Sequence, residues 1–177
     1  MKKKQIPRGA SFDSALEGLG RSCRTIELEH FEQWLVQYPS SSRFHFALMA
    51  GPYLSLLIRG IKRAESRFSK NRGAPFRVLA PDDIVIFQSV GRQIEAFGLV
   101  ERCLFFELSE SQPAMSVILQ YQDELQLLPD FVERKRDSAY ATLIWFKSLV
   151  PVSGPQVLKG DRRGWVPLCR EQTLSLL

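Results

Sequence analysis

The sequence predicts an α+β fold, a small β-barrel with flanking helices and an N-terminal helical extension. Three observations predict it. The segments follow the order strand, helix, several strands, helix, strand, strand, without the regular βαβ alternation of a parallel sheet. A long β segment at 93–108 has Gly98 in its middle, where a bulge or bend would let a small barrel close. With 177 residues and 45% hydrophobic content, the chain is long enough for one full core and an accessory segment.

The first 42 residues are expected to form an extension outside the barrel. Residues 1–10 are basic and read as a mobile tail, followed by a short helix at 13–19 and a longer one at 25–38. The run Pro39-Ser40-Ser41-Ser42 is the clearest linker in the chain. We therefore predict a domain boundary near residue 42, with the barrel domain at 43–177.

The barrel is expected to begin with a strand and a short helix. Apolar and polar side chains alternate over 43–48, which predicts a strand with His45 on its outer face as a surface or rim histidine. The next segment has Pro52 at a first-turn position and Gly60 at a left-handed stop, which indicates a two-turn helix. From Lys62 onward the residues alternate again, as expected of a strand with one polar face.

The rest of the chain completes the barrel. We expect a loop at 70–75, strands at 76–79 and 84–88 around an Asp82-Asp83 turn, the long segment at 93–108, and strands at 140–150 and 164–168. A helix is expected at 111–128, and Asp130 would cap a short continuation through Arg136. Its apolar face would consist of Met115, Ile118, Leu119 and Leu125. Trp165, in the closing strand, is expected in the core.

Composition limits the classes of function. No segment approaches the roughly 20 apolar residues of a spanning helix, and no apolar run follows the basic N-terminus, so we expect a cytoplasmic protein, or a nuclear one if eukaryotic. Cys23, Cys103 and Cys169 are odd in number and widely separated, which favours reduced thiols. With only His30 and His45 beside them, no zinc spacing exists, and we expect neither a metal nor a cofactor.

The excess positive charge is concentrated in one segment. Residues 59–77 contain seven basic side chains and one acid, Glu65, whereas the rest of the chain contains 17 basic and 18 acidic residues. Such a local excess is the electrostatic footprint expected where a polyanion docks. Within it, Gly60-x-Lys62-x-x-Glu65-x-Arg67 starts where the predicted helix ends, so a helix end and a strand start present cations and an anion at one rim.

This signature, preceded by Pro52-Tyr53 and Leu56-Leu57, resembles the ASCH (activating signal cointegrator homology) domains. The resemblance runs from about Phe44 to about Trp165. It implies a PUA-like β-barrel in a group linked to RNA binding, RNA processing and transcription coactivation. Members of the family also have a Gly-Asp turn before the next strand, and here Pro81-Asp82-Asp83 keeps the Asp but replaces the Gly.

Binding of RNA or another single-stranded nucleic acid is the function that the residues favour first, because lysine and arginine supply phosphate affinity and aromatic rings stack on unpaired bases. Tyr53 is the best placed ring, and Tyr140 and Trp145 are expected in the core. The predicted nucleic-acid-binding residues are Tyr53, Arg59, Lys62, Arg63, Arg67, Lys70 and Arg72.

A hydrolase at the same cleft is the alternative, with Lys62 and Glu65 as the candidate catalytic residues and RNA as one substrate. Some small ASCH proteins are amidohydrolases of acylated cytidine that use a Lys, a Thr three positions later and a distal Glu. Lys62 matches the Lys, but Glu65 occupies the Thr position, with Ser66 next to it; Glu95 and Glu101 are candidates for the distal acid.

A third reading is a protein-binding coactivator module. The helix at 25–38, with Phe31 and Trp34, would then be its docking face. The sequence leaves open whether the protein is an enzyme, and it predicts no membrane partner.

Overall fold

The structure is a computed structural model of the chain, and it describes residues 4–6, 43–90, 93–152, 157–159 and 163–168. The predicted N-terminal helices and the Pro-Ser linker lie outside the described residues, as do Cys23, His30 and Cys169. The domain boundary near residue 42 and the role of the 25–38 helix therefore stay predictions.

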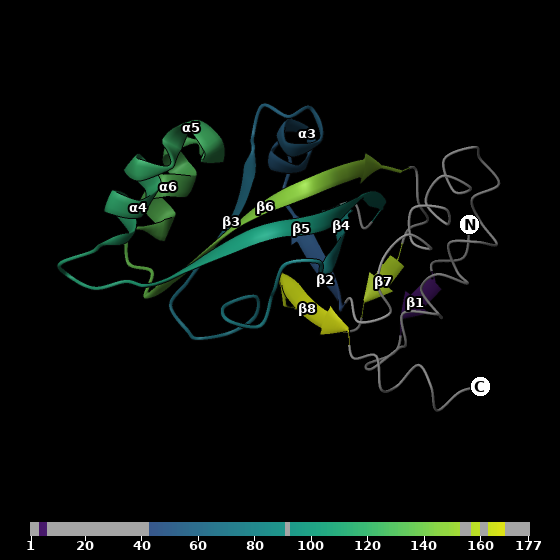
Figure 1. Cartoon of the computed structure of the whole chain (residues 1–177), viewed down its shortest axis with the longest axis horizontal. Helices are drawn as coiled ribbons and strands as arrows, with labels where there is room; N and C mark the ends of the chain where they lie inside the picture. The colour runs from purple at the N-terminus through teal and green to yellow at the C-terminus, as the bar shows by residue number, and fades with distance from the viewer. Residues whose placement is uncertain (1–3, 7–42, 91–92, 153–156, 160–162, 169–177) are drawn as a thin grey trace.

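A six-stranded mixed sheet forms the body of the fold (Figure 1). Its strands lie in the order β3-β6-β5-β4-β2-β8, and all neighbours are antiparallel except β2 and β4. The bounds are Phe44–Met49 for β2, Ala64–Ser69 for β3, Ile84–Ser89 for β4, Ile94–Glu107 for β5, Tyr140–Pro151 for β6 and Trp165–Leu168 for β8. In the described part of the chain, β3 and β8 end the order without pairing to each other, so the sheet is a half-barrel with an open seam.

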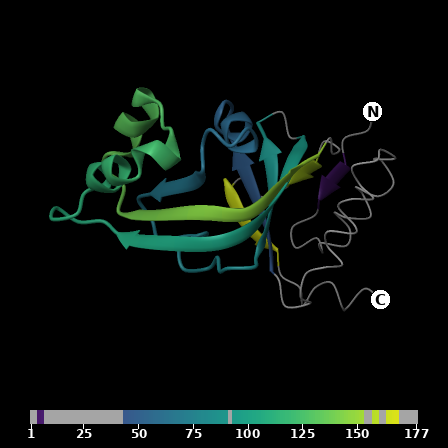
Figure 2. The same cartoon turned by 45° about the horizontal axis from the view of Figure 1, so that its top comes forward.

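Among the described residues, four short helices accompany this sheet: α3 at Tyr53–Ile58, α4 at Ala114–Gln120, α5 at Gln122–Leu125 and α6 at Pro129–Lys135. Helices α4, α5 and α6 group at one end of the long β5 and β6 strands, away from α3 (Figure 2). A separate two-stranded parallel sheet pairs β1, Lys4–Ile6, with β7, Val157–Lys159. None of the helices among the described residues has the length and apolar character needed to cross a membrane.

Two of the core clusters among the described residues lie on opposite faces of β6, because Ile144 belongs to one and its neighbours Leu143 and Trp145 belong to the other. The first lies inside the half-barrel, where α3 packs on β2, β4 and β6; its buried members include Leu54, Leu57, Phe87 and Ile144. The second lies under α4 to α6; its buried members include Phe68, Ile118, Leu125 and Leu143. Strand β3 contributes Ala64 and Phe68 to this second cluster.

Gly98 has a different role from the predicted bulge or bend that would let the barrel close. A Cβ at Gly98 would lie 2.6 Å from Cδ1 of Phe146 and 3.1 Å from Cε2 of Phe87, so glycine leaves room for these two rings. The register of β5 against β6 shifts just after it, between Leu99 and Val100 and again before Arg102. The long strand and its irregularity are thus confirmed, and the glycine itself serves ring packing.

The predicted strand at 76–79 is wrong. The Ala74-Pro75 peptide bond is cis, Arg77 has a positive φ of 53°, and the Val78 and Leu79 amides both donate to the Pro75 carbonyl at 3.0 and 3.2 Å. These features describe a main chain that folds back on itself. A strand would need extended backbone throughout.

The single helix expected at 111–128 is also wrong, because the chain forms α4 and α5 with a break at Tyr121. Ile118 and Leu125 are buried as expected, whereas Leu119 is 58% exposed. Helix α5 ends at Gln126, which has the left-handed φ of 48°. Asp130 lies in the first turn of α6, whose N-terminal cap position is Leu128, so it does not cap this helix.

The predicted turn before β4 is confirmed despite the missing glycine. Asp82 has a φ of 67°, the left-handed conformation that a glycine would adopt at little cost. Aspartate is among the residues that tolerate this region best. The departure from the Gly-Asp pattern therefore leaves the turn intact and Asp83 pointing into the fold.

Candidate functional site

The end of α3 sets the position of Lys62. Gly60 adopts a φ of 71° and its amide donates to the Leu57 carbonyl at 3.0 Å, while the Ile61 amide donates to Leu56 at 3.0 Å. This pair of bonds is a Schellman motif, in which the residue after the C-cap must be left-handed. The Lys62 amide also donates to Leu56, at 3.1 Å, so the chain wraps around the helix end and β3 starts at Ala64. The strand predicted from Lys62 thus begins two residues later, and Lys62 points inward.

Lys62 is a buried lysine, with 1% of its surface exposed. Its ammonium donates to the Leu125 carbonyl at the end of α5, at 2.8 Å, and lies 3.9 Å from Oε2 of Glu65. The ring of Tyr53 is 5.7 Å away. Burial lowers the pKa of Lys62 from 10.5 to about 8; Glu65 opposes this shift and Arg67 adds to it. At neutral pH the group is therefore still mostly a cation, and it becomes a neutral amine as the pH rises through about 8.

Glu65 and Arg67 hold the open seam together. The Arg67 Nε and Glu65 Oε1 atoms are 2.8 Å apart as an ion pair, although they are not aligned for a hydrogen bond. The other end of the guanidinium donates to the Leu48 carbonyl on β2 at 3.0 Å and to the Gly164 carbonyl before β8 at 3.4 Å. One side chain thus crosses from β3 to the opposite side of the half-barrel. The guanidinium also lies 5.1 Å from the centre of the Trp165 ring.

A cavity of about 410 Å³ lies at this seam. Its polar lining residues are Lys62, Glu65, Ser66, Arg67, Ser69, Lys135 and Thr142, and its aromatic ones are Tyr53, Phe68, Phe76, Phe131, Tyr140 and Trp165. Five consecutive residues of β3, 65–69, line it. Because neighbouring side chains point to opposite faces of a strand, a cavity that touches all five lies along the strand's edge. Its volume falls in the range of small-molecule sites, about 300–1,000 Å³.

Three solved structures have a similar fold. Crystal structures of ASCH from Zymomonas mobilis, of its serine-to-alanine variant and of its tyrosine-to-phenylalanine variant align with TM-scores of 0.56, 0.55 and 0.54. The chain has the fold of an ASCH domain. The identities are 13%, 13% and 14%, and the alignments cover 75% of this chain and 92%, 93% and 95% of those chains. No protein-family model matches the sequence, and no curated protein is similar to it. Such identities support the fold alone.

Within the ASCH fold, the predicted site residues separate into two groups. Tyr53, Lys62, Glu65 and Arg67 line the cavity together. The other predicted nucleic-acid-binding residues are exposed and are not among its lining residues: Arg59, Arg63, Lys70 and Arg72. The sequence signature therefore marks a cavity, and the basic residues near it in sequence are exposed outside the cavity lining.

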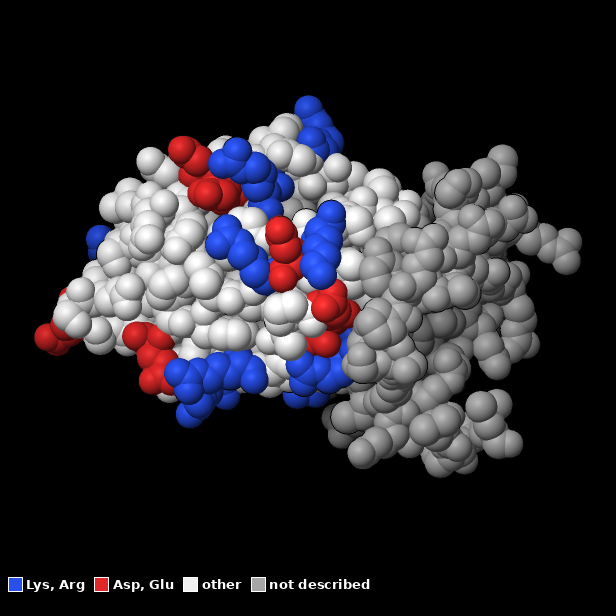
Figure 3. Space-filling model, viewed as in Figure 1, with Lys and Arg blue, Asp and Glu red and all other residues white. Residues whose placement is uncertain are grey.

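The surface over the long strands β5 and β6 has charges of both signs, in contrast to the basic segment (Figure 3). Figure 3 shows basic and acidic side chains interspersed over β5 and β6, without a large area of one sign. Two of the ion pairs in the half-barrel are Lys147 with Asp82 at 2.6 Å and Arg77 with Glu107 at 3.3 Å. Since a polyanion is attracted by an uncompensated positive surface, these strands are a poor docking face.

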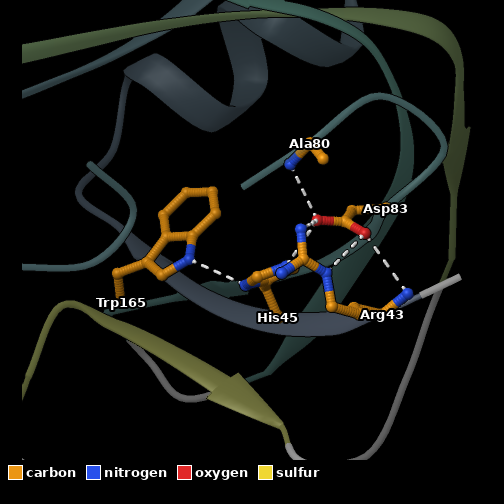
Figure 4. Close-up of polar contacts among 5 residues, drawn as sticks. All are labelled: Arg43, His45, Ala80, Asp83 and Trp165. Atoms are coloured by element: carbon orange, nitrogen blue, oxygen red, sulfur yellow. Dashed lines mark hydrogen bonds and ion pairs between the residues drawn. The ribbon is translucent and has the colours of Figure 1, made fainter. Parts of the chain in front are cut away.

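The expectation of a surface His45 is wrong, because its exposure is 1%. Its Nε2 lies 3.1 Å from Oδ2 of Asp83, and the indole Nε1–H of Trp165 donates to its Nδ1 at 3.3 Å (Figure 4). An indole N–H can only donate, so Nδ1 accepts, and Nε2 carries the ring proton and donates a hydrogen bond to Asp83. Arg43 and the Ala80 amide also donate to Asp83, at 3.1 and 2.8 Å. His45 thus anchors Trp165, which forms both core and cavity wall.

The charge of Asp83 is stabilised in this network. Burial raises the pKa of its carboxyl group, but hydrogen bonds from His45, Ala80 and Arg43 outweigh burial and hold the pKa below 3.8. Cys103 is a free thiol whose pKa rises to about 12, through burial and the charge of Asp83. A thiol with this pKa is not a nucleophile at neutral pH.

Several cavity residues escaped the sequence analysis. Lys135 and Phe131 come from α6, about 70 positions after the signature, and only their spacing of four on one helix indicated a shared face. Thr142 faces Arg67 across the β3–β6 pair. Tyr140 lines the cavity while packing on Phe76, and Trp145 is 7% exposed, as expected of a core ring.

The candidates for a distal acid, Glu95 and Glu101, are absent from the cavity lining, where Glu65 is the one carboxylate among the described residues. No group of three metal-binding side chains lies close together in the part of the chain that the structure describes.

Proposed function

We propose that this ASCH-fold protein binds single-stranded RNA and holds one nucleotide in the cavity at the seam. The observation that carries the proposal is the pairing of cationic and aromatic groups in a cavity of nucleotide size. Lys62, Arg67 and Lys135 supply the positive charge, and the rings of Tyr53 and Phe131 lie beside them. Cations bind phosphate and aromatic faces stack on unpaired bases, so this lining suits a nucleotide released from a duplex.

The exposed basic residues would bind the phosphates on either side of that nucleotide. Arg59, Arg63, Lys70 and Arg72 all lie within ten positions of Lys62 and keep their charges in solvent. Such contacts release counterions and give affinity that is independent of sequence. We propose that the cavity provides selectivity and the surrounding surface provides most of the salt-dependent affinity.

Fluorescence anisotropy with a labelled RNA octamer tests this division. Lys135→Gln and Arg134→Gln each remove one positive charge from the last turn of α6, but Lys135 lines the cavity and Arg134 does not. We expect Lys135→Gln to weaken binding about tenfold, as for the loss of a charged hydrogen bond, and to reduce the slope of log K against log salt by about 0.7. Arg134→Gln should change neither. Equal effects of the two variants would remove the cavity as the binding site.

A hydrolase is the second candidate, favoured by one observation. Lys62 has a pKa near 8 and lies 3.9 Å from Glu65 in a cavity, so an amine and a carboxylate able to move protons are neighbours. RNA cleavage fits this lining better than hydrolysis of acylated cytidine, because no second carboxylate among the described residues lines the cavity.

Product analysis distinguishes the two candidates. Wild type and Glu65→Gln are incubated with RNA and with acylated cytidine, and thermal unfolding checks that the variant is folded. Release of product by wild type and its loss in Glu65→Gln would support the hydrolase. If wild type converts neither substrate, the binding function stands alone; full turnover by Glu65→Gln would exclude this carboxylate from the chemistry.

A further inference from the structure

One edge of β3 has no neighbouring strand in the part of the chain that the structure describes. In the described structure β3 has a strand neighbour, β6, on one side only. The Ser69 carbonyl accepts from the Ala139 amide at 2.9 Å, so residue 69 faces the β6 side. The Phe68 carbonyl instead accepts from the Lys135 ammonium on α6 at 3.2 Å, so residue 68 faces the open edge. Main-chain groups point to alternate sides along a strand, and the amide and carbonyl of Ser66 therefore face the open edge as well.

The side chain of Ser66 adds a third group at this place. Its residue surface is 5% exposed, and its Oγ has no hydrogen-bond partner among the described residues. Ser66 lines the cavity. A buried hydroxyl without a partner destabilises the fold unless a ligand or an ordered water satisfies it. One residue thus offers an N–H donor, a carbonyl acceptor and a hydroxyl that can do either.

Two kinds of ligand use an open strand edge: a peptide that adds as a further strand, and a planar ring that carries a donor and an acceptor side by side. A peptide strand needs main-chain groups along its whole length. Here Lys135 already occupies the Phe68 carbonyl, and Phe131 and Tyr53 line the same cavity. What remains is the main chain of one residue, which suits one ring, in a cavity of about 410 Å³ that has room for the rest of its nucleotide.

We propose that the open edge of β3 reads the Watson–Crick edge of one unpaired nucleobase, through the main chain and the hydroxyl of Ser66. This inference rests on the proposed RNA binding and adds its selectivity element. The base lies beside β3 in the plane of the sheet, where a neighbouring strand would lie. Its Watson–Crick edge forms the hydrogen bonds that such a strand would form with the main chain of β3. The phosphate of the same nucleotide then lies near the cations at the cavity, Lys62, Arg67 and Lys135.

Amide NMR of the full chain provides the first test. A random-sequence RNA octamer is titrated into ¹⁵N-labelled protein, and the Ser66 and Arg67 amides are compared. We expect the Ser66 amide to shift downfield and to gain protection from solvent exchange, because it acquires an acceptor. Arg67 lies two positions before Ser69, so its amide also faces β6 and should shift little. RNA that binds without moving the Ser66 amide would overturn the proposal.

Base discrimination provides the second test. Affinities for the four homopolymeric RNA octamers are measured with wild type, Ser66→Ala and Ser69→Ala. Ser69 is the matched control, since it lines the same cavity but its hydroxyl already donates to the Asn71 carbonyl at 2.8 Å. We expect Ser66→Ala to reduce the ratio between the best and worst octamer about two- to tenfold, as for one lost hydrogen bond, without changing the salt dependence. Ser69→Ala should keep the wild-type ratio.

The outcomes separate the inference from the function on which it rests. If wild type binds no octamer, the proposed RNA binding fails and the inference fails with it. If wild type binds RNA but Ser66→Ala keeps the full ratio, only the inference is overturned. A Ser66 amide that shifts with an octapeptide of alternating valine and threonine, and not with RNA, would overturn it in favour of strand addition.

Discussion

Replacement of Lys62 by methionine should remove a pH dependence that this one buried amine gives to the fold. The pKa of Lys62 falls from 10.5 to about 8 on folding, because burial disfavours the ammonium. Between these two values the unfolded chain binds a proton that the folded chain has released. Stability therefore rises with pH in this window.

The magnitude follows from the size of the shift. Each pKa unit corresponds to about 1.4 kcal/mol, so the shift of Lys62 from 10.5 to about 8 amounts to about 3 kcal/mol across the window. Below pH 8 the side chain is charged in both states and contributes no slope. Lys62→Met has no titrating group there, and Lys62→Arg stays charged throughout, so both variants should lack the rise.

Urea unfolding, followed through the fluorescence of the buried Trp145 and Trp165, measures this effect at pH 7.0 to 9.5 in steps. Other titrating groups contribute equally in wild type and in Lys62→Met, so their contributions cancel in the difference between the two unfolding free energies. We expect this difference to be flat below pH 8 and to rise by about 2 kcal/mol by pH 9.5. A difference that stays flat, or falls, would refute the account of Lys62 as a buried amine with a lowered pKa.

Three further predictions concern the framework of the site. Asp83→Asn should destabilise the fold by about 1–3 kcal/mol, because it weakens the charge-assisted hydrogen bonds from His45 and Arg43, and urea unfolding measures it. The pKa of Asp83 is lower in the folded chain than in the unfolded chain, so its contribution to stability is present above about pH 3.9 and is lost as the pH falls through the folded pKa. If wild type and Asp83→Asn lose stability in parallel in an acid titration, this explanation is wrong. Gly98→Ala should cost about 1–3 kcal/mol, since the new Cβ would lie 2.6 Å from the Phe146 ring, whereas Gly73→Ala meets nothing within 4 Å and should cost much less in the same assay. Gly60→Ala should destabilise the fold by about 1–2 kcal/mol, because alanine is strained at a φ of 71°. Gly51→Ala is the control, since a Cβ at Gly51 also meets nothing within 4 Å but Gly51 has no positive φ. Equal melting temperatures of the two variants would exclude strain at the end of α3.

The elements that sequence predicted well are those with local signals. The Pro-to-Gly spacing around α3, the Asp82-Asp83 turn and the length of β5 are each encoded within a few residues. Errors arose where the main chain depends on distant partners. The turn around Arg77 carries apolar residues in a strand-like pattern, and periodicity alone does not distinguish it from a strand.

The same contrast holds for the site. The signature brought Lys62, Glu65 and Arg67 together because they are neighbours in sequence at a helix end. Sequence placed His45 at the surface because a strand with one solvent face is the usual case. In the structure β4 and β8 flank β2 and bring Asp83 and Trp165 to the histidine. Pairings over such separations have no local pattern, and neither has the contact of Lys135 with β3.

Photo-crosslinking tests most directly the claim that RNA enters the cavity at the β3 edge. An octamer with one 4-thiouridine is irradiated with the full chain, and the attached peptides are identified by mass spectrometry. The account predicts crosslinks on residues that line the cavity, above all Tyr53, Phe131 and Tyr140, and their loss in Lys135→Gln but not in Arg134→Gln. Crosslinks confined to residues outside the lining, with the same pattern in both variants, would contradict it.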